Sequence, residues 1–304
     1  MYLHDDKAAF RAAVLSCADS LGMPPAYVAK DYFIVLMLKE ITGRNPDVVF
    51  KGGTSLSKCH NAIDRFSEDV DLGLEAAHAT EGMRKRMKGC VVDSVDAVGL
   101  AIENLDQTRS KREFNKFIVS LPALGESPVE PLIVETAVIT PASPAEKMPI
   151  RMFLWEWADA EGVGDGLGEY EGTKPFELLV NSKERTFADK VFAICDYYLD
   201  DAPIPERQSR HVYDLYKLLQ LIEMDDALVE LILTVRSQRL GKNRCPSADV
   251  DVSVPDTIDE IVRVGAYEGD YVNVTSKLLY EDVSYEAAVA ALSKISAWLR
   301  ENGI

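Results

Sequence analysis

Two short segments in the first quarter of the chain carry residue types that could bind a nucleotide and a metal ion. In residues 51–56, two glycines and two hydroxyl residues follow a lysine. Backbone N–H groups in such a turn can point at a phosphate, and the following helix adds its positive dipole end. In residues 66–72, two aspartates, Asp69 and Asp71, are separated by a single residue. Strand side chains alternate with period two, so both carboxylates are expected on one face, where hard oxygen ligands suit Mg²⁺.

These two segments together indicate phosphoryl or nucleotidyl transfer, and an α/β domain is needed to position them. A strand at 48–50 leads into the glycines, a helix follows at 55–62, and the aspartates begin a strand that continues over 70–74. This order of elements is typical of an α/β fold, which we expect over residues 1–160. The other elements expected there are three helices and two strands, at residues 7–17, 25–41, 80–104, 116–121 and 132–139.

Glu135 interrupts the apolar run of residues 132–138, which reads as a buried strand. A carboxylate in such a strand is costly unless it is paired or bound to a metal ion. A functional role for Glu135 and a place on an exposed face of the strand are both open from the residues alone.

The second half of the chain reads as mostly helical. A glycine-rich acidic stretch at 161–172 marks a boundary, and a helical domain is expected over 173–304. Lys190 lies among apolar residues of its helix, where it could be a surface lysine or could reach a triphosphate as a mobile charge. The segment 210–216, which contains Asp214, is by itself more typical of a polar network between helices. The helices are expected at residues 186–199, 207–222, 225–236, 257–266 and 284–302.

Four motifs in a fixed order resemble the AbiEii family of nucleotidyltransferase toxins, which includes the mycobacterial MenT proteins and is related to the DNA polymerase β-like nucleotidyltransferases. The resemblance covers residues 29–219. The motifs are KGGTSLSK at 51–58, RFSEDVDL at 65–72, ADK at 188–190 and RHVYDLY at 210–216.

The resemblance implies a polymerase β-like core with a mixed sheet, followed by a mainly helical C-terminal domain that contributes Lys190 and Asp214 to the site. Lys190 would contact the triphosphate, and Asp214 would be the essential acidic residue of the last motif. Glu135 is the best match by position for the third carboxylate of the superfamily. Asp69 and Asp71 would bind Mg²⁺ or Mn²⁺, with Glu135 as a further ligand. The residues implied in binding the NTP are Lys51, Gly52, Gly53, Thr54, Ser55, Lys58 and Arg210.

Composition limits the partners and the location of the protein. The formal net charge of −17 opposes non-specific binding of nucleic acid, so an RNA partner would need a local basic patch. Solvated helix faces are the more ordinary explanation of the three basic clusters, which lie at residues 84–88, 111–116 and 236–244. The five scattered cysteines indicate neither a zinc site nor disulfides. There is no apolar run of about 18 residues, so we expect a cytoplasmic protein without a membrane partner.

The leading hypothesis is a toxin of a type IV toxin–antitoxin system that acts in phage defence. It would transfer nucleotides from NTP to RNA, with the 3′ end of tRNA as the acceptor that the resemblance implies, and a cognate antitoxin would be its partner. One alternative is a nucleotidyltransferase that modifies a protein or a small molecule such as an aminoglycoside. Another is a non-catalytic NTP-binding module, which the presence of Asp69, Asp71 and Lys190 disfavours.

Overall fold

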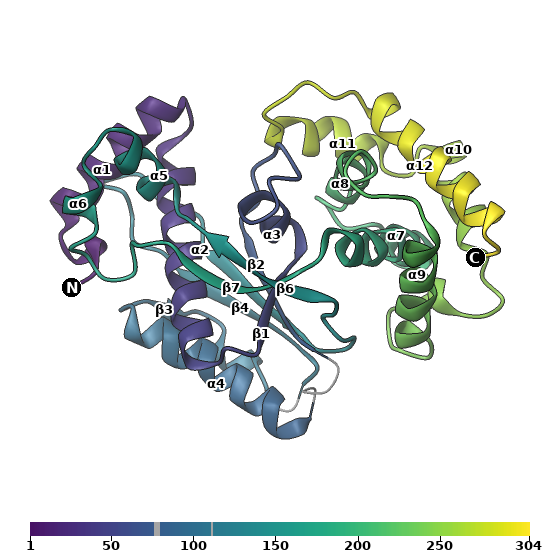
Figure 1. Ribbon diagram of the computed structural model, residues 1–304, viewed down its shortest axis with the longest axis horizontal. Coiled ribbons are helices and arrows are strands. Elements are labelled where there is room, and N and C mark those ends of the chain that lie inside the picture. Colours follow the sequence, from purple (N-terminus) through teal and green to yellow (C-terminus); the bar gives the residue numbers. More distant parts are fainter. Residues whose placement is uncertain (76–79, 111) are drawn as a thin grey trace. The chain divides into compact units, whose positions relative to one another are not determined.

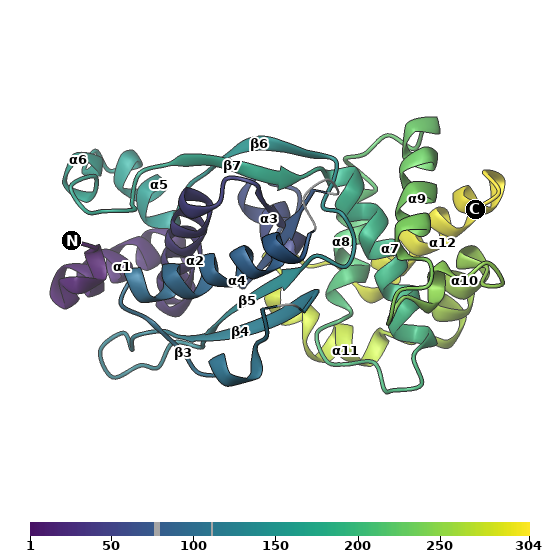
Figure 2. The ribbon, with the colours of Figure 1, turned by 90° about the horizontal axis from the view of Figure 1, so that it is seen from below.

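The computed structural model describes residues 1–75, 80–110 and 112–304 and divides the chain into two compact units (Figures 1 and 2). The first unit comprises Met1–Cys59 and Ser67–Asn181. The second comprises Ser182–Ile304 together with the short segment His60–Phe66. The first unit is built around a sheet, whereas the second is helical, as expected for the two halves of the chain.

The first unit contains a mixed sheet, which is seven-stranded within the described residues, in the order β3-β4-β5-β2-β1-β7-β6. At its centre β1 pairs antiparallel with β2 and parallel with β7, and β2 pairs parallel with β5. The outer pairs, β4 with β5, β3 with β4 and β6 with β7, are antiparallel. The strands are β1 Val48–Lys51, β2 Asp69–Leu74, β3 Ala101–Ile102, β4 Phe114–Ser120, β5 Leu132–Ala137, β6 Ala145–Ile150 and β7 Phe176–Asn181.

Helix α2 (Pro25–Arg44) lies at the centre of the first unit, where it packs against α1, α4 and α5 and against strands β2 and β5 (Figure 2). Residues 28–38 of this helix are all buried, so this stretch has no solvent-exposed polar face. On the sheet, Val70, Leu72 and Val134 point into this core. Alternation therefore directs Asp69 and Asp71 to the opposite face. The other helices of the unit are α1 Lys7–Leu21, α3 Gly52–Lys58, α4 Glu81–Ala97, α5 Phe153–Ala160 and α6 Gly164–Leu167.

The second unit packs its helices around α7 (Lys183–Leu199), which contacts α8, α9 and α10. Several of these helices begin with a side-chain cap visible in the sequence. The Ser182 hydroxyl accepts the Arg185 N–H, and Ser253 and Ser284 cap α10 and α12 in the same way. The remaining helices are α8 Arg210–Leu218, α9 Asp226–Arg239, α10 Val254–Val264, α11 Glu268–Asn273 and α12 Tyr285–Glu301.

No helix in residues 1–75, 80–110 and 112–304 combines the length and the apolar character needed to cross a bilayer.

The observed elements differ from the expected ones in several places, and helices α5, α6 and α11 were not expected. Strands β6 and β7 were not expected, and because β7 pairs with β1, the division between the units falls at Asn181–Ser182 instead of within residues 161–172. Helix α3 begins at Gly52 instead of residue 55, since the positive φ of Gly52, 78°, lets the strand turn directly into a helix. Helix α4 ends at Ala97, before Gly99 with a φ of 70°, and strand β3 follows.

A buried ion pair between α2 and α3 supports the first unit. Lys58 Nζ lies 2.7 Å from Asp31 Oδ1, and the two side chains are 8% and 4% exposed. The second Asp31 oxygen accepts the Phe153 N–H at 2.6 Å, and the Lys58 ammonium lies 4.0 Å from the Phe153 ring centroid. Burial raises the pKa of Asp31, and Lys58 opposes that shift. Lys58 therefore compensates a carboxylate that would otherwise be buried alone.

We expect Lys58→Met to lower the free energy of unfolding by about 3–5 kcal/mol, because it leaves a buried carboxylate without its cation. Urea denaturation at neutral pH measures this change. Lys294→Met, at an exposed position on α12, is the control and should change stability by less than about 0.5 kcal/mol. Adding Asp31→Asn should recover part of the loss. An unchanged stability of Lys58→Met would contradict the structural role of this pair.

Candidate active site

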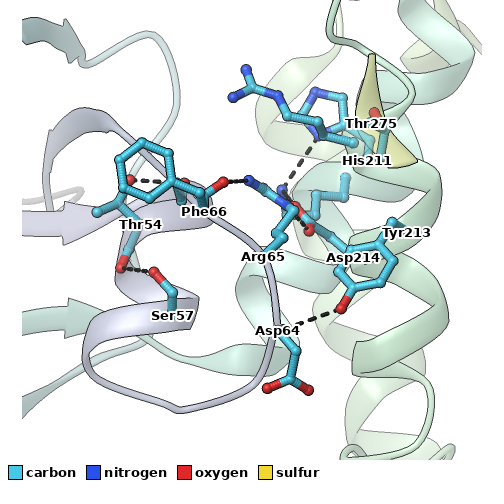
Figure 3. A network of polar contacts seen from close by, with 12 residues as sticks. Thr54, Ser57, Asp64, Arg65, Phe66, His211, Tyr213, Asp214 and Thr275 are labelled. Carbon is cyan, nitrogen blue, oxygen red and sulfur yellow. Dashed lines mark hydrogen bonds and ion pairs between the residues drawn. The ribbon is translucent and has the colours of Figure 1, made fainter. Parts of the chain in front are cut away.

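The start of α3 forms the first half of the candidate site. Lys51 ends β1 and stands at the N-cap position of α3, where its side chain makes no capping hydrogen bond within the described chain. The first backbone N–H groups of a helix have no partner inside the helix and can serve an anion. Hydroxyl groups stabilise this turn, since Ser55 Oγ donates to the Gly52 carbonyl at 2.9 Å. Ser57 Oγ donates to the Thr54 carbonyl at 3.1 Å (Figure 3).

A row of four charged residues crosses the sheet and forms the second half. Lys51 on β1 lies opposite Asp71 on β2, Asp71 lies opposite Glu135 on β5, and Glu135 lies opposite Lys116 on β4. Residues directly opposite one another in a sheet point to the same face. The Lys116 ammonium is 3.7 Å from Glu135 Oε1. Asp69, two residues before Asp71, joins this face, so three carboxylates lie between two lysines.

The pKa of Glu135 is raised by its environment, which includes the neighbouring carboxylates. Burial, followed by the negative charge of Asp71, raises the pKa of Glu135 to about 7. Asp69 adds to the shift, whereas Lys116 and Lys51 oppose it. The two lysines thus compensate the negative charge only in part, and an added cation would relieve the remaining repulsion.

Gly52 joins the two halves of the site. A Cβ atom at this position would lie 2.0 Å from Asp71 Oδ2, so any other residue would displace the carboxylate. Its φ of 78° also lies in the region that glycine adopts without strain. Gly52 therefore allows the Asp71 carboxylate to approach the first turn of α3.

Lys190 and Asp214 lie within the second unit, in a buried network with Arg65. Figure 3 shows Arg65, Asp214 and His211 of this network. Asp214 accepts from Arg65 Nε at 2.7 Å and from the second terminal nitrogen at 2.8 Å, and Lys190 Nζ lies 2.7 Å from Asp214 Oδ2. Burial alone would raise the pKa of Asp214, but Arg65 and Lys190 hold it well below its usual value. Burial lowers the pKa of Lys190, while Asp214 opposes that shift.

His211 completes this network as a neutral ring. Burial, followed by the charge of Lys190, lowers its pKa well below the ordinary value of 6.5. Its Nδ1 lies 3.3 Å from Lys190 Nζ and its Nε2 lies 3.1 Å from Gln208 Oε1. Lys190 can therefore donate to Nδ1, while the ring N–H at Nε2 donates to Gln208.

A family model described as "Nucleotidyl transferase AbiEii toxin, Type IV TA system" matches residues 38–291. The protein belongs to the AbiEii family of nucleotidyltransferase toxins. Among solved structures, MenT4, a nucleotidyltransferase toxin from Mycobacterium tuberculosis H37Rv, superposes with a TM-score of 0.60 at 22% identity, covering 96% of this chain and 89% of that one. No curated protein sequence matches the chain. The expected family and fold class are thus confirmed.

The acidic face of this AbiEii-family protein fits a divalent metal ion by its chemistry. Asp69 and Asp71 offer hard carboxylate oxygens, and the crowding with Glu135 favours added positive charge. Within the described residues, no group of three or more His, Cys, Asp or Glu side chains could hold a metal ion. Because Mg²⁺ in proteins is commonly held by one or two carboxylates together with substrate phosphates, two aspartates suffice for the protein's share. Glu135 as a third ligand stays a prediction.

The remaining residues predicted to bind nucleotide already have partners within the protein. Lys58 pairs with Asp31, and Arg210 Nε donates to the Arg207 carbonyl at 2.9 Å. Arg65 was not singled out by the sequence analysis, although it begins the second of the four motifs. Arg65 is hard to recognise from the sequence because an arginine in a polar loop is usually exposed to solvent.

Several cations of the basic clusters also make internal contacts. Arg236 donates to the carbonyls of Asp249 and Val252, and Lys88 donates to the Thr108 carbonyl. Lys111, from the second cluster, lies outside the described residues. Arg236 and Lys88 therefore bond to the protein itself, which differs from the solvated helix faces expected from the sequence.

We expect Gly52→Ala to lower the rate of nucleotidyl transfer by about 100-fold, because a displacement of about 1 Å at a reacting group has an effect of this size. Gly89→Ala is the matched control, since a Cβ at Gly89 in α4 meets nothing within 4 Å. Steady-state transfer assays, with circular dichroism to check folding, measure the two variants. Full activity of Gly52→Ala would show that the position of Asp71 does not matter for the reaction.

We expect Glu135→Gln to stabilise the metal-free protein at high pH. The folded-state pKa of Glu135, about 7, lies above the ordinary value of 4.5, so ionisation weakens the fold progressively between these values and fully above them. The gain should reach about 1–3 kcal/mol near pH 8 and vanish below about pH 4.5. Thermal denaturation across this range, with the exposed Glu146→Gln as control, tests it. A gain in stability that does not depend on pH would rule out repulsion between Glu135 and the neighbouring carboxylates.

Proposed function

We propose that this AbiEii-family toxin is an Mg²⁺-dependent nucleotidyltransferase that transfers nucleotides from NTP to RNA, with the 3′ end of tRNA as the acceptor. The observation that carries the proposal is the approach of the Asp71 carboxylate to the glycine start of α3. A phosphate-binding turn and a metal-binding carboxylate must lie together for a metal ion to act on a bound triphosphate. Membership of a type IV toxin family also implies an antitoxin as partner.

The residues of the first unit divide the chemistry among them. The first turn of α3 would bind phosphate oxygens through backbone N–H groups, and Lys51 would add positive charge. Asp69 and Asp71 would hold the metal ion, which when bound supplies charge stabilisation at the phosphate and lowers the pKa of the attacking hydroxyl. Glu135, which lies opposite Asp71 on β5, would be a further ligand of that ion. Contact of Lys190 with the triphosphate stays a prediction.

The net charge of the protein bears on the identity of the acceptor. A net charge of −17 disfavours a polyanionic acceptor away from a local basic surface and would attract a cationic one. The second candidate is therefore a nucleotidyltransferase that modifies a small cationic molecule such as an aminoglycoside. The family of toxins favours RNA, because arrest of growth follows directly when tRNA is blocked.

We expect the purified protein to incorporate label from one preferred NTP into total tRNA in the presence of Mg²⁺, and EDTA should abolish the incorporation. Periodate oxidation of the tRNA 3′ terminus should also abolish it, since the terminal hydroxyl is then lost. Parallel reactions with an aminoglycoside and with cell protein identify the alternatives. Label in the aminoglycoside or in cell protein, with none in tRNA, would overturn RNA as the acceptor. No label in any of the three would overturn the proposed nucleotidyltransferase activity.

We expect Asp69→Ala to remove both transfer and the arrest of growth on expression, because it removes a proposed metal ligand. Folding should be retained, since the change relieves repulsion between carboxylates. Asp93→Ala, at an exposed position on α4, is the matched control and should remain active and toxic. Toxicity that persists in Asp69→Ala would contradict catalysis through this site.

A further inference from the structure

The segment His60–Phe66 links the two motifs of the proposed site along the chain, yet it belongs to the helical unit. Helix α3, which carries the phosphate-binding turn, ends at Lys58, and β2 begins at Asp69. The chain thus leaves the first unit between its two functional motifs and returns at Ser67. The anchoring of this segment therefore constrains the chain that leaves α3 and the chain that enters β2.

Backbone pairing with residues 278–280 holds the segment from one side. The Phe66 N–H donates to the Leu278 carbonyl at 2.9 Å, the Tyr280 N–H donates to the Asp64 carbonyl at 2.8 Å, and an antiparallel bridge joins Arg65 to Leu279. Asp64 is held further from α8, because its N–H donates to the Tyr213 hydroxyl at 3.1 Å. These bonds fix the path of the main chain.

The Arg65 side chain fixes the segment from the other side. Its guanidinium makes a bidentate contact with Asp214 and also donates to the Phe66 carbonyl at 3.0 Å (Figure 3). Arg65 is 3% exposed and Asp214 is 0% exposed. Bidentate pairs combine strength with a fixed geometry, and removing one partner of a buried pair is strongly destabilising. This pair therefore determines where Arg65 and the chain that follows it lie.

The contacts of Asp214 leave it no evident way to act on a substrate. One carboxylate oxygen accepts from Arg65 Nε, and the other is shared by the Arg65 terminal nitrogen and the Lys190 ammonium. A fully buried carboxylate that already accepts three charged hydrogen bonds is poorly suited to bind a metal ion or to take a proton. Its interactions instead point to a role in holding Arg65.

The residues after Phe66 are fixed within the first unit. The Ser67 and Thr54 hydroxyls share a hydrogen bond of 2.9 Å, and Glu68 pairs with Lys30 at 2.8 Å. Asp69 follows immediately. The chain entering the carboxylate-bearing strand is thus anchored on both sides of the border between Phe66 and Ser67, and the loss of either anchor would loosen it.

We propose that Arg65 is a positioning residue for nucleotidyl transfer, and that Asp214 acts through Arg65 by fixing residues 60–66 rather than by contacting the substrate. The proposal rests on the nucleotidyltransferase function proposed above. It distinguishes two roles for Asp214: a group that binds substrate or metal, and the anchor of a chain segment that leads to Asp69.

Kinetics of Arg65→Met, Asp214→Asn and the double variant test the proposal. Each single variant should lower kcat by about 100-fold, with the KM for NTP and the Mg²⁺ dependence changed by less than about threefold, because orientation is lost while binding groups remain. The double variant should be no slower than the slower single variant, since both changes remove one connection. Losses that multiply, or a raised KM in Asp214→Asn alone, would overturn the proposal.

Hydrogen exchange provides a readout that does not need activity. The amides of Asp64, Phe66 and Tyr280 should exchange faster in Arg65→Met and in Asp214→Asn than in the wild type. Arg263→Met removes an exposed arginine–carboxylate pair on α10 and is the matched control, expected to change neither exchange at these amides nor kcat. Unchanged exchange in Arg65→Met would overturn the anchoring.

A conservative variant and the wild-type assay separate the possible failures. Arg65→Lys keeps the charge but loses the bidentate geometry, so it should fold even where Arg65→Met does not, and its kcat should lie between those of Arg65→Met and the wild type. A kcat of Arg65→Lys equal to that of the wild type would overturn the need for the bidentate contact. If the wild type transferred no nucleotide, the proposed function would fail, while the exchange measurement would still decide the anchoring.

Discussion

Repulsion among carboxylates on one face of a sheet is the constraint on which the candidate site depends. Asp69, Asp71 and Glu135 are brought together because β2 and β5 run parallel with Asp71 opposite Glu135. The lysines at the two ends of this row reduce the repulsion without removing it, as the raised pKa of Glu135 indicates. The opposite face of the same strands packs against α2, so the stability of the core compensates the cost of this arrangement.

The glycine at the start of α3 has a second role that depends on the acidic face of the sheet. In an ordinary turn, glycine supplies a backbone conformation that other residues avoid. At Gly52 it also leaves the space that Asp71 occupies. The N–H groups at the start of α3 attract a phosphate, whereas the nearby Asp71 carboxylate would repel it if no cation were present. Their proximity therefore favours a substrate that arrives with a divalent metal ion. The triphosphate of an NTP meets this requirement.

Buried ion pairs supply the rigidity around the site. Lys58 with Asp31 joins α3 to α2, Lys30 with Glu68 holds the entry to β2, and Arg65 with Asp214 holds the preceding segment in the helical unit. Such pairs add little net stability compared with apolar packing, but they tolerate few alternative geometries. Lys58, predicted to bind nucleotide, and Asp214, predicted to be catalytic, are therefore both engaged in buried ion pairs that fix parts of the fold.

Local patterns in the sequence were sufficient to predict where the carboxylates of β2 and the glycine turn lie. Alternation of Asp69 and Asp71 in a strand and the glycine turn after β1 follow from periods and turn preferences that involve only neighbouring residues. The helices of the second unit other than α11 were also predicted, since their apolar spacing is local. Strand β7 was missed because its partner β1 lies far away along the chain, and β6 was missed because its exposed, polar residues form an edge.

The sequence by itself determined the class of chemistry, the order of the four motifs and the family. Only the tertiary structure decided which charged residues meet: Glu135 with Asp71 across parallel strands, Lys58 with Asp31, and Arg65 with Asp214. The physical reason is that periodicity records which face a side chain occupies, whereas ion pairing depends on strand register and helix packing between distant segments. A charged residue therefore looks the same in the sequence whether it binds a ligand or holds the fold together.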